Sequence, residues 1–318
     1  MKPDNFEWVQ NGTHVMVDLW MYNFSRNIHD FLDGNSINDL NTLNNQQNQE
    51  KKSAIVIGGG PSVRDNKHLE LLAKSDYQGS IVCTDRMLVQ CLENGITPER
   101  FPKFYVLTID PYEITLKFYS NEIIKKHSNG ISAIMSTCTM HETIELCKQQ
   151  GLNIFWFHPL IDDFRKLESI NRIMNMMAKS DKNPKGFPGL QTGGNVGSFC
   201  WIFSWAILGC SPVSLIGLNM GVDSSVPIEE TQHYSQVLNH FDGDKTKVHE
   251  KYRKIFNPDL KTESLLDPVF DFYREALIDL VKRAPNWVQT INSTEGGSLF
   301  GDRIENKKFK EFLDEFNV

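Results

Sequence analysis

Short apolar runs recur along the chain from residue 53 onward, and polar residues follow each of them. The runs read AIVIG, SIVCTD, FYVLTID, ISAIMST, NIFWFHP, VSLIGLN and VQTINST. Segments of helical character, such as NKHLELLAKS and MHETIELCKQQG, lie between the first six runs. Buried strands that alternate with amphipathic helices are typical of a parallel sheet with helices on both faces. The pattern therefore predicts a doubly wound, Rossmann-like α/β fold with a mostly parallel sheet.

Segments outside this pattern complete the predicted organisation. The N-terminal segment, 1–34, is aromatic-rich and helical in character. The segment that follows it, 35–52, is rich in Asn and Gln with almost no large apolar residues. Two less regular stretches, near 160–192 and 221–262, interrupt the main domain, and we expect them to form insertions, the peripheral one helical. The predicted units are an N-terminal helical element at 1–34, a polar linker at 35–52, the main domain at 53–300 and a C-terminal helix at 301–318.

The composition of the chain narrows its possible partners. The 318 residues carry a formal net charge of -7 and no long run of Lys or Arg, whereas nucleic-acid binding needs a basic face. No apolar run is long enough to span a membrane, and the N-terminus MKPDNFEWVQ has no apolar core of a secretory signal. We therefore expect a cytoplasmic protein with no nucleic-acid partner. The six cysteines form no CxxC pair, which predicts free thiols.

Ligands of a doubly wound sheet bind at the carboxyl ends of its strands, so the residues after each run are the candidates for a site. The first run is followed by Gly58, Gly59, Gly60, Pro61 and Ser62. Glycines let backbone amides approach an anion, and the helix that follows adds its positive end. The loop is neither a Walker loop nor GxGxxG. From these residues alone it is either a phosphate-binding loop or a tight corner between a strand and a helix.

Acidic residues follow the second and third runs. Asp85 ends SIVCTD and Asp110 ends FYVLTID. Two carboxylates at neighbouring strand ends can bind a ribose hydroxyl or a magnesium ion, and an Asp in this place is also a frequent helix cap. The pattern favours a cap for Asp85 and a functional role for Asp110.

Three further features complete the candidates. Thr192, Gly193, Gly194 and Asn195 open an apolar helix, whose N-terminus forms a second potential anion site. Glu295, after the last run, is either an acid or base or part of a helix-capping loop. Among the histidines, which carry protons near neutral pH, His233 is the first candidate and His158 the second.

Several motifs occur together in one order: IVIGGGPSV, TD after the second strand, ENGITPERFPKFYVLTIDP, GGNVGSFCWIFSWAILGCSPVSLIGLNMG and INSTEGG. Over about residues 53–300 they resemble the 6-hydroxymethylpterin diphosphokinase-like (MptE-like) domain. This domain is also found in motility accessory factors, the flagellin glycosyltransferases. Its fold is similar to that of bacterial sialyltransferases, which use a related Gly-x-Gly-Pro-Ser loop.

The resemblance implies a nucleotide or nucleotide-sugar donor with its phosphates against Gly58–Ser62. In a diphosphokinase, ATP gives its diphosphate to a pterin hydroxymethyl group, and magnesium near Asp110 and Asp85 is needed. In a glycosyltransferase, a CMP-linked nonulosonic acid gives its sugar to the hydroxyl of an acceptor, a protein or a small molecule, without a metal cofactor. His233 would then be the base, and Ser62 with the loop amides would hold the departing phosphate.

The glycosyltransferase is the favoured interpretation. The motif TIDPYE lacks the second acid that archaeal diphosphokinases carry after the Asp110 position, and TIDP and STEGG resemble the motility accessory factors more closely. Asn219 stands where those factors usually carry an acidic residue. A non-catalytic nucleotide- or sugar-binding module is the third interpretation.

Overall fold

The centre of the protein is one sheet of ten strands in which every pair is parallel. The computed structural model describes residues 3–40 and 53–316, with side chains from residue 16 onward. The order is β1-β6-β5-β4-β3-β2-β8-β12-β13, and β7 pairs with β6. The strands are β1 (Asn35–Ser36), β2 (Ala54–Ile57), β3 (Ser80–Thr84), β4 (Phe104–Thr108), β5 (Ile131–Ser136), β6 (Asn153–Pro159), β7 (Gly189–Leu190), β8 (Val213–Ile216), β12 (Thr290–Asn292) and β13 (Ile304–Asn306).

The strand order reverses at β2. From β2 the chain adds β3, β4, β5 and β6 on one side, and then returns to add β8, β12 and β13 on the other. In open parallel sheets the crevice for a ligand lies at such a reversal, outside the carboxyl ends of the strands. The glycine loop after β2 and the turn after β8 therefore meet at the place where a ligand is expected.

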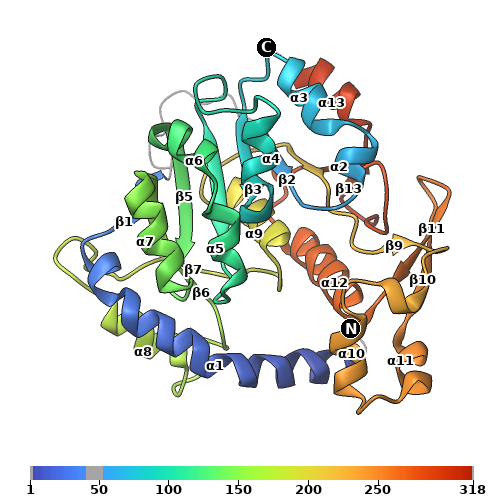
Figure 1. Ribbon diagram of the computed structural model, residues 1–318, viewed down its shortest axis with the longest axis horizontal. Coiled ribbons are helices and arrows are strands. Elements are labelled where there is room, and N and C mark those ends of the chain that lie inside the picture. Colours follow the sequence, from blue (N-terminus) through green and yellow to red (C-terminus); the bar gives the residue numbers. More distant parts are fainter. Residues whose placement is uncertain (1–2, 41–52, 317–318) are drawn as a thin grey trace.

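Helices cover both faces of the sheet, as the hydrophobic pattern predicted (Figure 1). Alternate side chains of β2 enter two separate cores, because successive residues of a strand point to opposite faces. Ile55 and Ile57 join one core and Ala54 and Val56 the other. The first core packs on α1 (Pro3–Leu32), α3 (His68–Lys74), α4 (Leu88–Glu93), α5 (Ile114–Tyr119), α6 (Glu122–His127), α7 (His141–Gln150), α8 (Ile170–Met177) and α13 (Phe309–Phe316), and the second on α9 (Val196–Ala206) and α12 (Pro268–Arg283).

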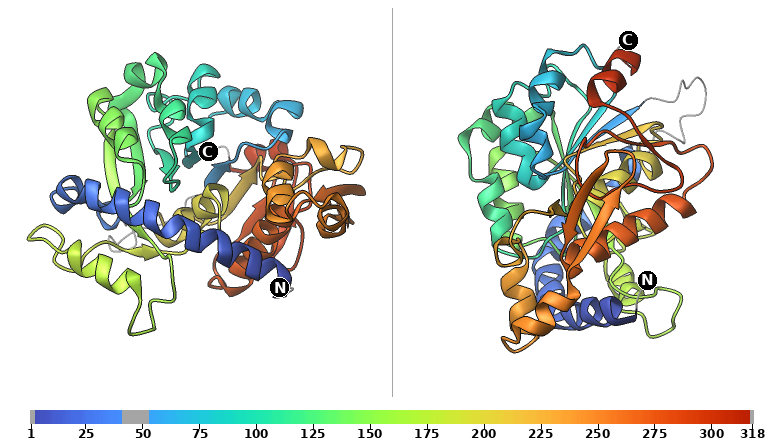
Figure 2. Two further views of the ribbon diagram at one scale, coloured as in Figure 1. Left: turned by 60° about the horizontal axis from the view of Figure 1, so that its bottom comes forward. Right: turned by 90° about the vertical axis from the view of Figure 1, so that its right-hand side faces the viewer.

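The N-terminal helix α1 runs along the carboxyl edge of the sheet (Figures 1 and 2). Its Asn23 amide donates to the carbonyl oxygens of Pro111, at 3.0 Å, and Cys138. Its Asn27 amide donates to those of Thr137 and Thr139. These carbonyls belong to the loops after β4 and β5, so α1 is fixed to the edge at which ligands bind.

Two predicted segments differ from their description in the structure. Residues 35–40 are not linker: they form β1, which pairs with β6, and a 3-10 helix (Ile37–Leu40) whose Ile37 is buried. The rest of the predicted linker, 41–52, lies outside the described residues. The C-terminal segment is more than a helix, because β13 within it is the last strand of the main sheet. The strands β1 and β13 are only two and three residues long, too short to show a strand pattern in the sequence.

The peripheral insertion at 221–262 is only partly helical. It contains α10 (Tyr234–His240) and α11 (Lys245–Lys251). It also forms a three-stranded antiparallel sheet, in the order β10-β11-β9, from β9 (Val222–Asp223), β10 (Arg253–Asn257) and β11 (Thr262–Leu266). The sequences of β10, RKIFN, and β11, TESLL, do not alternate regularly between apolar and polar residues, so they carry no clear strand signal.

The cysteine prediction is confirmed, because all six cysteines are buried free thiols. Among the described residues, no helix combines the length and the apolar character that crossing a membrane requires.

Candidate functional site

The glycine loop after β2 is joined to the turn after β8 by backbone and side-chain hydrogen bonds. Gly58 N donates to Ile216 O at 2.9 Å, and Gly60 N donates to Gly217 O at 2.8 Å. The Ser62 hydroxyl donates to Asn219 Oδ1, also at 2.9 Å. These hydrogen bonds hold the glycine loop and the β8 turn together at the reversal point of the sheet, and they fix the conformation of the loop.

The three loop glycines meet different surroundings. A Cβ on Gly58 would lie 2.6 Å from Leu218 Cδ1 and 2.7 Å from Gly217 O, and one on Gly60 would overlap Asn219 Oδ1. Gly59 is exposed, and the atoms nearest to a Cβ there would be those of the Arg86 side chain, 3.3 Å away at Cδ, and Met87 Sδ. Gly58 and Gly60 are therefore glycines because the β8 turn approaches closely. Gly59 is the loop residue that faces outward, as close approach of a ligand to backbone requires.

One expectation about this loop was wrong. The helix that follows it, α2 (Ser62–Asp65), is a single turn of four residues. Its few aligned peptide dipoles cannot supply the positive end expected from a longer helix. Ser62 does not cap α2 either: Pro61 occupies the N-cap position, and the Ser62 hydroxyl is directed to Asn219. A bound anion would depend on loop amides and nearby side chains instead.

Asp85 and Asp110 lie at neighbouring strand ends, as predicted, but in different environments. Asp85 is buried; its Oδ1 accepts from the Arg86 backbone N–H at 2.8 Å, and its Oδ2 has no hydrogen-bond partner among the described residues. Burial, and then the charge of Asp110, raise the pKa of Asp85 to about 7. Asp110 is only half-buried, and partial burial raises its pKa as well. Asp110 is therefore the carboxylate that a ligand can reach.

The buried Asp85 carboxyl should make stability depend on pH. Its pKa rises from the ordinary 3.8 to about 7 on folding, so the folded chain holds the proton more tightly. Stability is then greatest below about pH 4 with respect to this group, and falls as pH rises toward 7, by at most about 1.4 kcal/mol per pH unit. We expect Asp85→Asn to flatten the dependence of the unfolding free energy on pH between 5 and 8, measured in urea. The exposed Asp65→Asn is the control; equal slopes for Asp85→Asn and wild type would contradict the prediction.

The burial of Asp85 also bears on whether Asp85 and Asp110 could bind magnesium. Mg²⁺ keeps several of its waters when it binds to proteins. Asp85 is 3% exposed, which places it among core side chains. A carboxylate buried from solvent is poorly placed to face an ion that keeps its waters, so the pair fits magnesium poorly, although Asp110 alone could face one.

The second predicted anion site is a capped helix end. The Asn195 side chain accepts from Ser198 N at 2.9 Å and donates to the Ser198 hydroxyl, so it acts as the N-cap of α9. Thr192 Oγ1 accepts from Gly194 N. Gly193 and Gly194 have positive φ angles of 64° and 83°, and a Cβ on Gly194 would lie 2.8–3.0 Å from Phe272 and Tyr273 of α12. This loop is thus fitted against α12 at the carboxyl edge.

His233 forms a buried pair with a carboxylate. Its Nδ1 lies 2.8 Å from Asp267 Oδ2, and both residues are buried. The other oxygen of Asp267 accepts from Val269 N and Phe270 N and caps α12. Because a carboxylate only accepts, it holds the proton on Nδ1 and leaves Nε2 with a lone pair. The Nε2 atom meets the side-chain amide of the exposed Gln232, at 3.2 Å. The arrangement orients the ring and directs Nε2 toward an exposed side chain.

Tyr273 of α12 connects this pair with the strand ends. Burial raises the pKa of Tyr273, and the charges of Asp110 and Asp267 raise it further. Tyr273 therefore lies within electrostatic range of both carboxylates, in addition to its packing against Gly194. The pair and the loop before α9 therefore both contact α12: Asp267 caps its N-terminus and Gly194 packs against its Tyr273.

The other two candidates make contacts that belong to the fold. Glu295 lies beside the glycine loop, because its backbone carbonyl accepts from Asn66 Nδ2 at 3.4 Å. The Glu295 carboxylate accepts from Phe309 N, at the start of α13, at 3.0 Å, and lies 3.3 Å from His68 Nε2. These contacts are those of the capping loop, the alternative that the sequence left open. His158 is buried between Thr137, at 3.0 Å, and Asn171, at 3.1 Å, and burial lowers its pKa to about 4. A histidine in that setting is a packed core residue.

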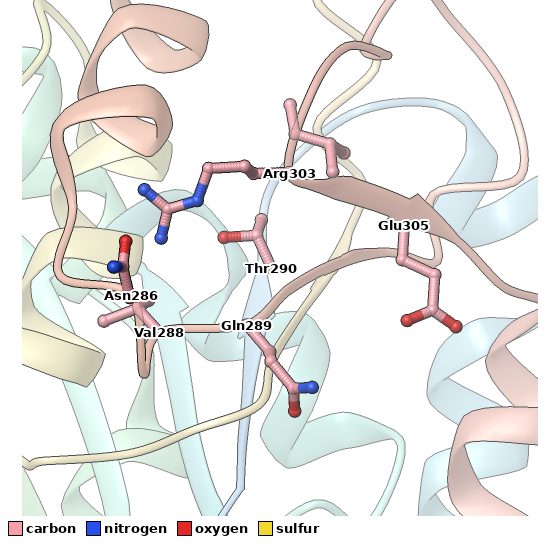
Figure 3. A pocket seen from close by; sticks show the side chains of 7 residues that line it. Asn286, Val288, Gln289, Thr290, Arg303 and Glu305 are labelled. Atoms are coloured by element: carbon pink, nitrogen blue, oxygen red, sulfur yellow. The ribbon is translucent and has the colours of Figure 1, made fainter.

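A hollow of about 400 Å³ lies at the opposite edge of the sheet (Figure 3). It sits at the amino ends of β12 and β13, away from the edge where parallel sheets bind ligands. The Arg303 guanidinium beside it donates to three backbone carbonyls, those of Lys282, Ala284 and Pro285. Its charged group is thus committed to the fold. The lining residues are Asn286, Val288, Gln289, Thr290, Arg303, Ile304 and Glu305.

The reversed parallel sheet with a glycine loop at its carboxyl edge defines a doubly wound, Rossmann-like α/β protein. The chain belongs to the 6-hydroxymethylpterin diphosphokinase MptE-like family, which it matches over residues 22–225. Its fold is similar to that of the MAf glycosyltransferase from Magnetospirillum magneticum AMB-1, with a TM-score of 0.53 and 12% sequence identity. The similarity covers 89% of this chain and 39% of that one, so the chain spans well under half of that protein. No curated protein has a matching sequence.

Proposed function

We propose that the protein is a glycosyltransferase that moves a nonulosonic-acid-type sugar from a CMP donor to an acceptor hydroxyl. The observation that carries this proposal is the buried pair of His233 and Asp267, whose atoms Nδ1 and Oδ2 are 2.8 Å apart. Transfer of a glycosyl group to a hydroxyl needs a base that takes the hydroxyl proton, and a histidine oriented by a carboxylate is suited to that step. Membership of the MptE-like family and the fold shared with a MAf glycosyltransferase are consistent with it.

In the proposed reaction, the acceptor displaces Gln232 from His233 Nε2. That nitrogen takes the hydroxyl proton while the acceptor oxygen bonds to the anomeric carbon. The bond from this carbon to the phosphate oxygen breaks, and CMP leaves with the electron pair. The positive charge that forms on His233 is stabilised by Asp267, and the exposed backbone at Gly59 holds the phosphate. These steps use no metal.

The diphosphokinase is the second candidate, because Asp85 and Asp110 do lie at neighbouring strand ends. In that reaction magnesium would offset the charge that develops on the phosphates of ATP. The burial of Asp85 argues against a hydrated ion between them. A non-catalytic binding module, the third interpretation, is disfavoured by the buried His233–Asp267 pair, since a binding protein has no use for an oriented base.

Ligand-induced thermal stabilisation distinguishes these functions. A ligand that binds only the folded chain stabilises it by about 2.7 kcal/mol at a hundredfold excess over Kd, which raises Tm by several degrees. We expect this rise with CMP in the presence of EDTA. A rise only with ATP plus magnesium would favour the diphosphokinase instead. No rise with either nucleotide would contradict both enzymes.

A further inference from the structure

We infer that Arg86 is a phosphate-binding residue, whose guanidinium closes over the anion held at the glycine loop. The inference deepens the proposed function and rests on it, since it requires a nucleotide phosphate at Gly59. Arg86 belongs to the 3-10 helix Asp85–Met87, directly after β3. Because Ile57 of β2 is paired with Cys83 of β3, the glycine loop after β2 and the segment after β3 leave the sheet side by side.

The position of the side chain is the first observation. A Cβ on Gly59 would lie 3.3 Å from Arg86 Cδ and 3.7 Å from Nε. The stem of the arginine thus passes over the one loop glycine that faces outward, while its neighbours Gly58 and Gly60 are closed off by the β8 turn. A group bound at the Gly59 backbone would lie next to the guanidinium.

The unused hydrogen-bonding capacity of Arg86 is the second observation. Throughout residues 3–40 and 53–316, no hydrogen bond or ion pair of the guanidinium is seen, and the residue is exposed. Its charge acts on Asp85, whose pKa it lowers slightly against the larger effect of burial. By contrast Arg64, on the short helix after the loop, is paired with Asp65 at 2.9 Å. Of these two arginines, Arg86 is the one whose guanidinium N–H donors are unpaired within the described residues.

The chemistry of the group fits this position. A guanidinium presents its N–H donors in a planar fork that matches two phosphate oxygens at once. The short α2 supplies little dipole, so a cationic side chain has to provide the charge that a longer helix would add elsewhere. The chain carries a net charge of -7, and an acidic surface makes one local cation more important for an anionic ligand.

Calorimetric binding of CMP, cytidine and ATP to wild type, Arg86→Ala, Arg86→Lys and Arg64→Ala tests the inference. We expect Arg86→Ala to weaken CMP binding about 10- to 100-fold and to leave cytidine binding unchanged. Arg86→Lys should recover part of the loss, and Arg64→Ala should bind as wild type does. Equal Tm values for the four proteins confirm that each is folded.

The outcomes separate the two proposals. If wild type binds CMP and Arg86→Ala binds it equally well, the role of Arg86 is wrong and the proposed function stands. If ATP binds in place of CMP and Arg86→Ala weakens it, the donor is wrong and the role of Arg86 stands. If wild type binds CMP no better than cytidine and does not bind ATP, phosphate is not recognised and Arg86 has no such role.

Discussion

Replacing Asp267 with Asn should abolish glycosyl transfer while leaving the fold and the nucleotide affinity intact. Asn keeps the oxygen that caps α12 through Val269 N and Phe270 N. It places an N–H₂ donor where Oδ2 now faces His233 Nδ1, so the histidine proton moves to Nε2. A histidine with that tautomer cannot take a proton from the acceptor. We expect the transfer rate to fall about 10²- to 10⁴-fold, measured as release of CMP in the presence of acceptor.

Three further variants make this result specific. His233→Ala should lose as much rate as Asp267→Asn, and the double variant should lose no more than either, because the two residues act as one unit. His240→Ala, at an exposed position on the same helix α10, should retain the wild-type rate. Full activity of Asp267→Asn would show that His233 is not the base.

Replacing Gly60 with Ala should destabilise the protein and weaken nucleotide binding together. The new methyl group would overlap Asn219 Oδ1 and lie 2.6 Å from Gly217 O. Either the loop or the β8 turn must then move, which breaks the hydrogen bond from Ser62 to Asn219. We expect the free energy of unfolding in urea to fall by about 1–3 kcal/mol, the range for overpacking.

Gly59→Ala is the matched control for this steric argument. The atoms nearest to its methyl group would be side-chain atoms of Arg86, at 3.3 Å, and of Met87, so the unfolding free energy should change by less than about 0.5 kcal/mol. Equal destabilisation by Gly59→Ala and Gly60→Ala would mean that the β8 turn does not set the conformation of the loop.

The sheet could be predicted because its strands are buried on both faces and so appear as short apolar runs. All four residues of β2, Ala54–Ile57, are fully buried, and the same holds for most of β3 and β8. The two strands at the edges could not be found this way. β1 (Asn35–Ser36) and β13 (Ile304–Asn306) are polar and very short, and they are held by ladder hydrogen bonds that carry no sequence signal.

The candidate site was predicted in part, for a related reason. Strand-end residues such as Gly58–Ser62, Asp85 and Asp110 can be placed from the fold pattern alone. His233 was singled out without its partner. The sequence Asp267-Pro268 indicates the start of a helix, and α12 does begin there. The contact of Asp267 with His233 could not be predicted, because His233 lies 34 residues away in the sequence. The positions of Arg86 beside Gly59 and of Tyr273 beside Gly194 were missed, because the contacts of exposed or helical residues depend on neighbours that folding supplies.

The junction of β2 and β8 also affects how the chain must fold. The inner edge of β2 is completed only by Val213–Ile216, which leave the ribosome roughly 10–30 s after β2 at about 5–20 residues per second. Until then β2 is an edge strand of four apolar residues, with no charge or proline to prevent pairing with another chain. Until β8 pairs with it, the exposed edge of β2 can pair with another chain, which favours aggregation. The pairing of β2 with β8 removes this edge and at the same time assembles the ligand crevice.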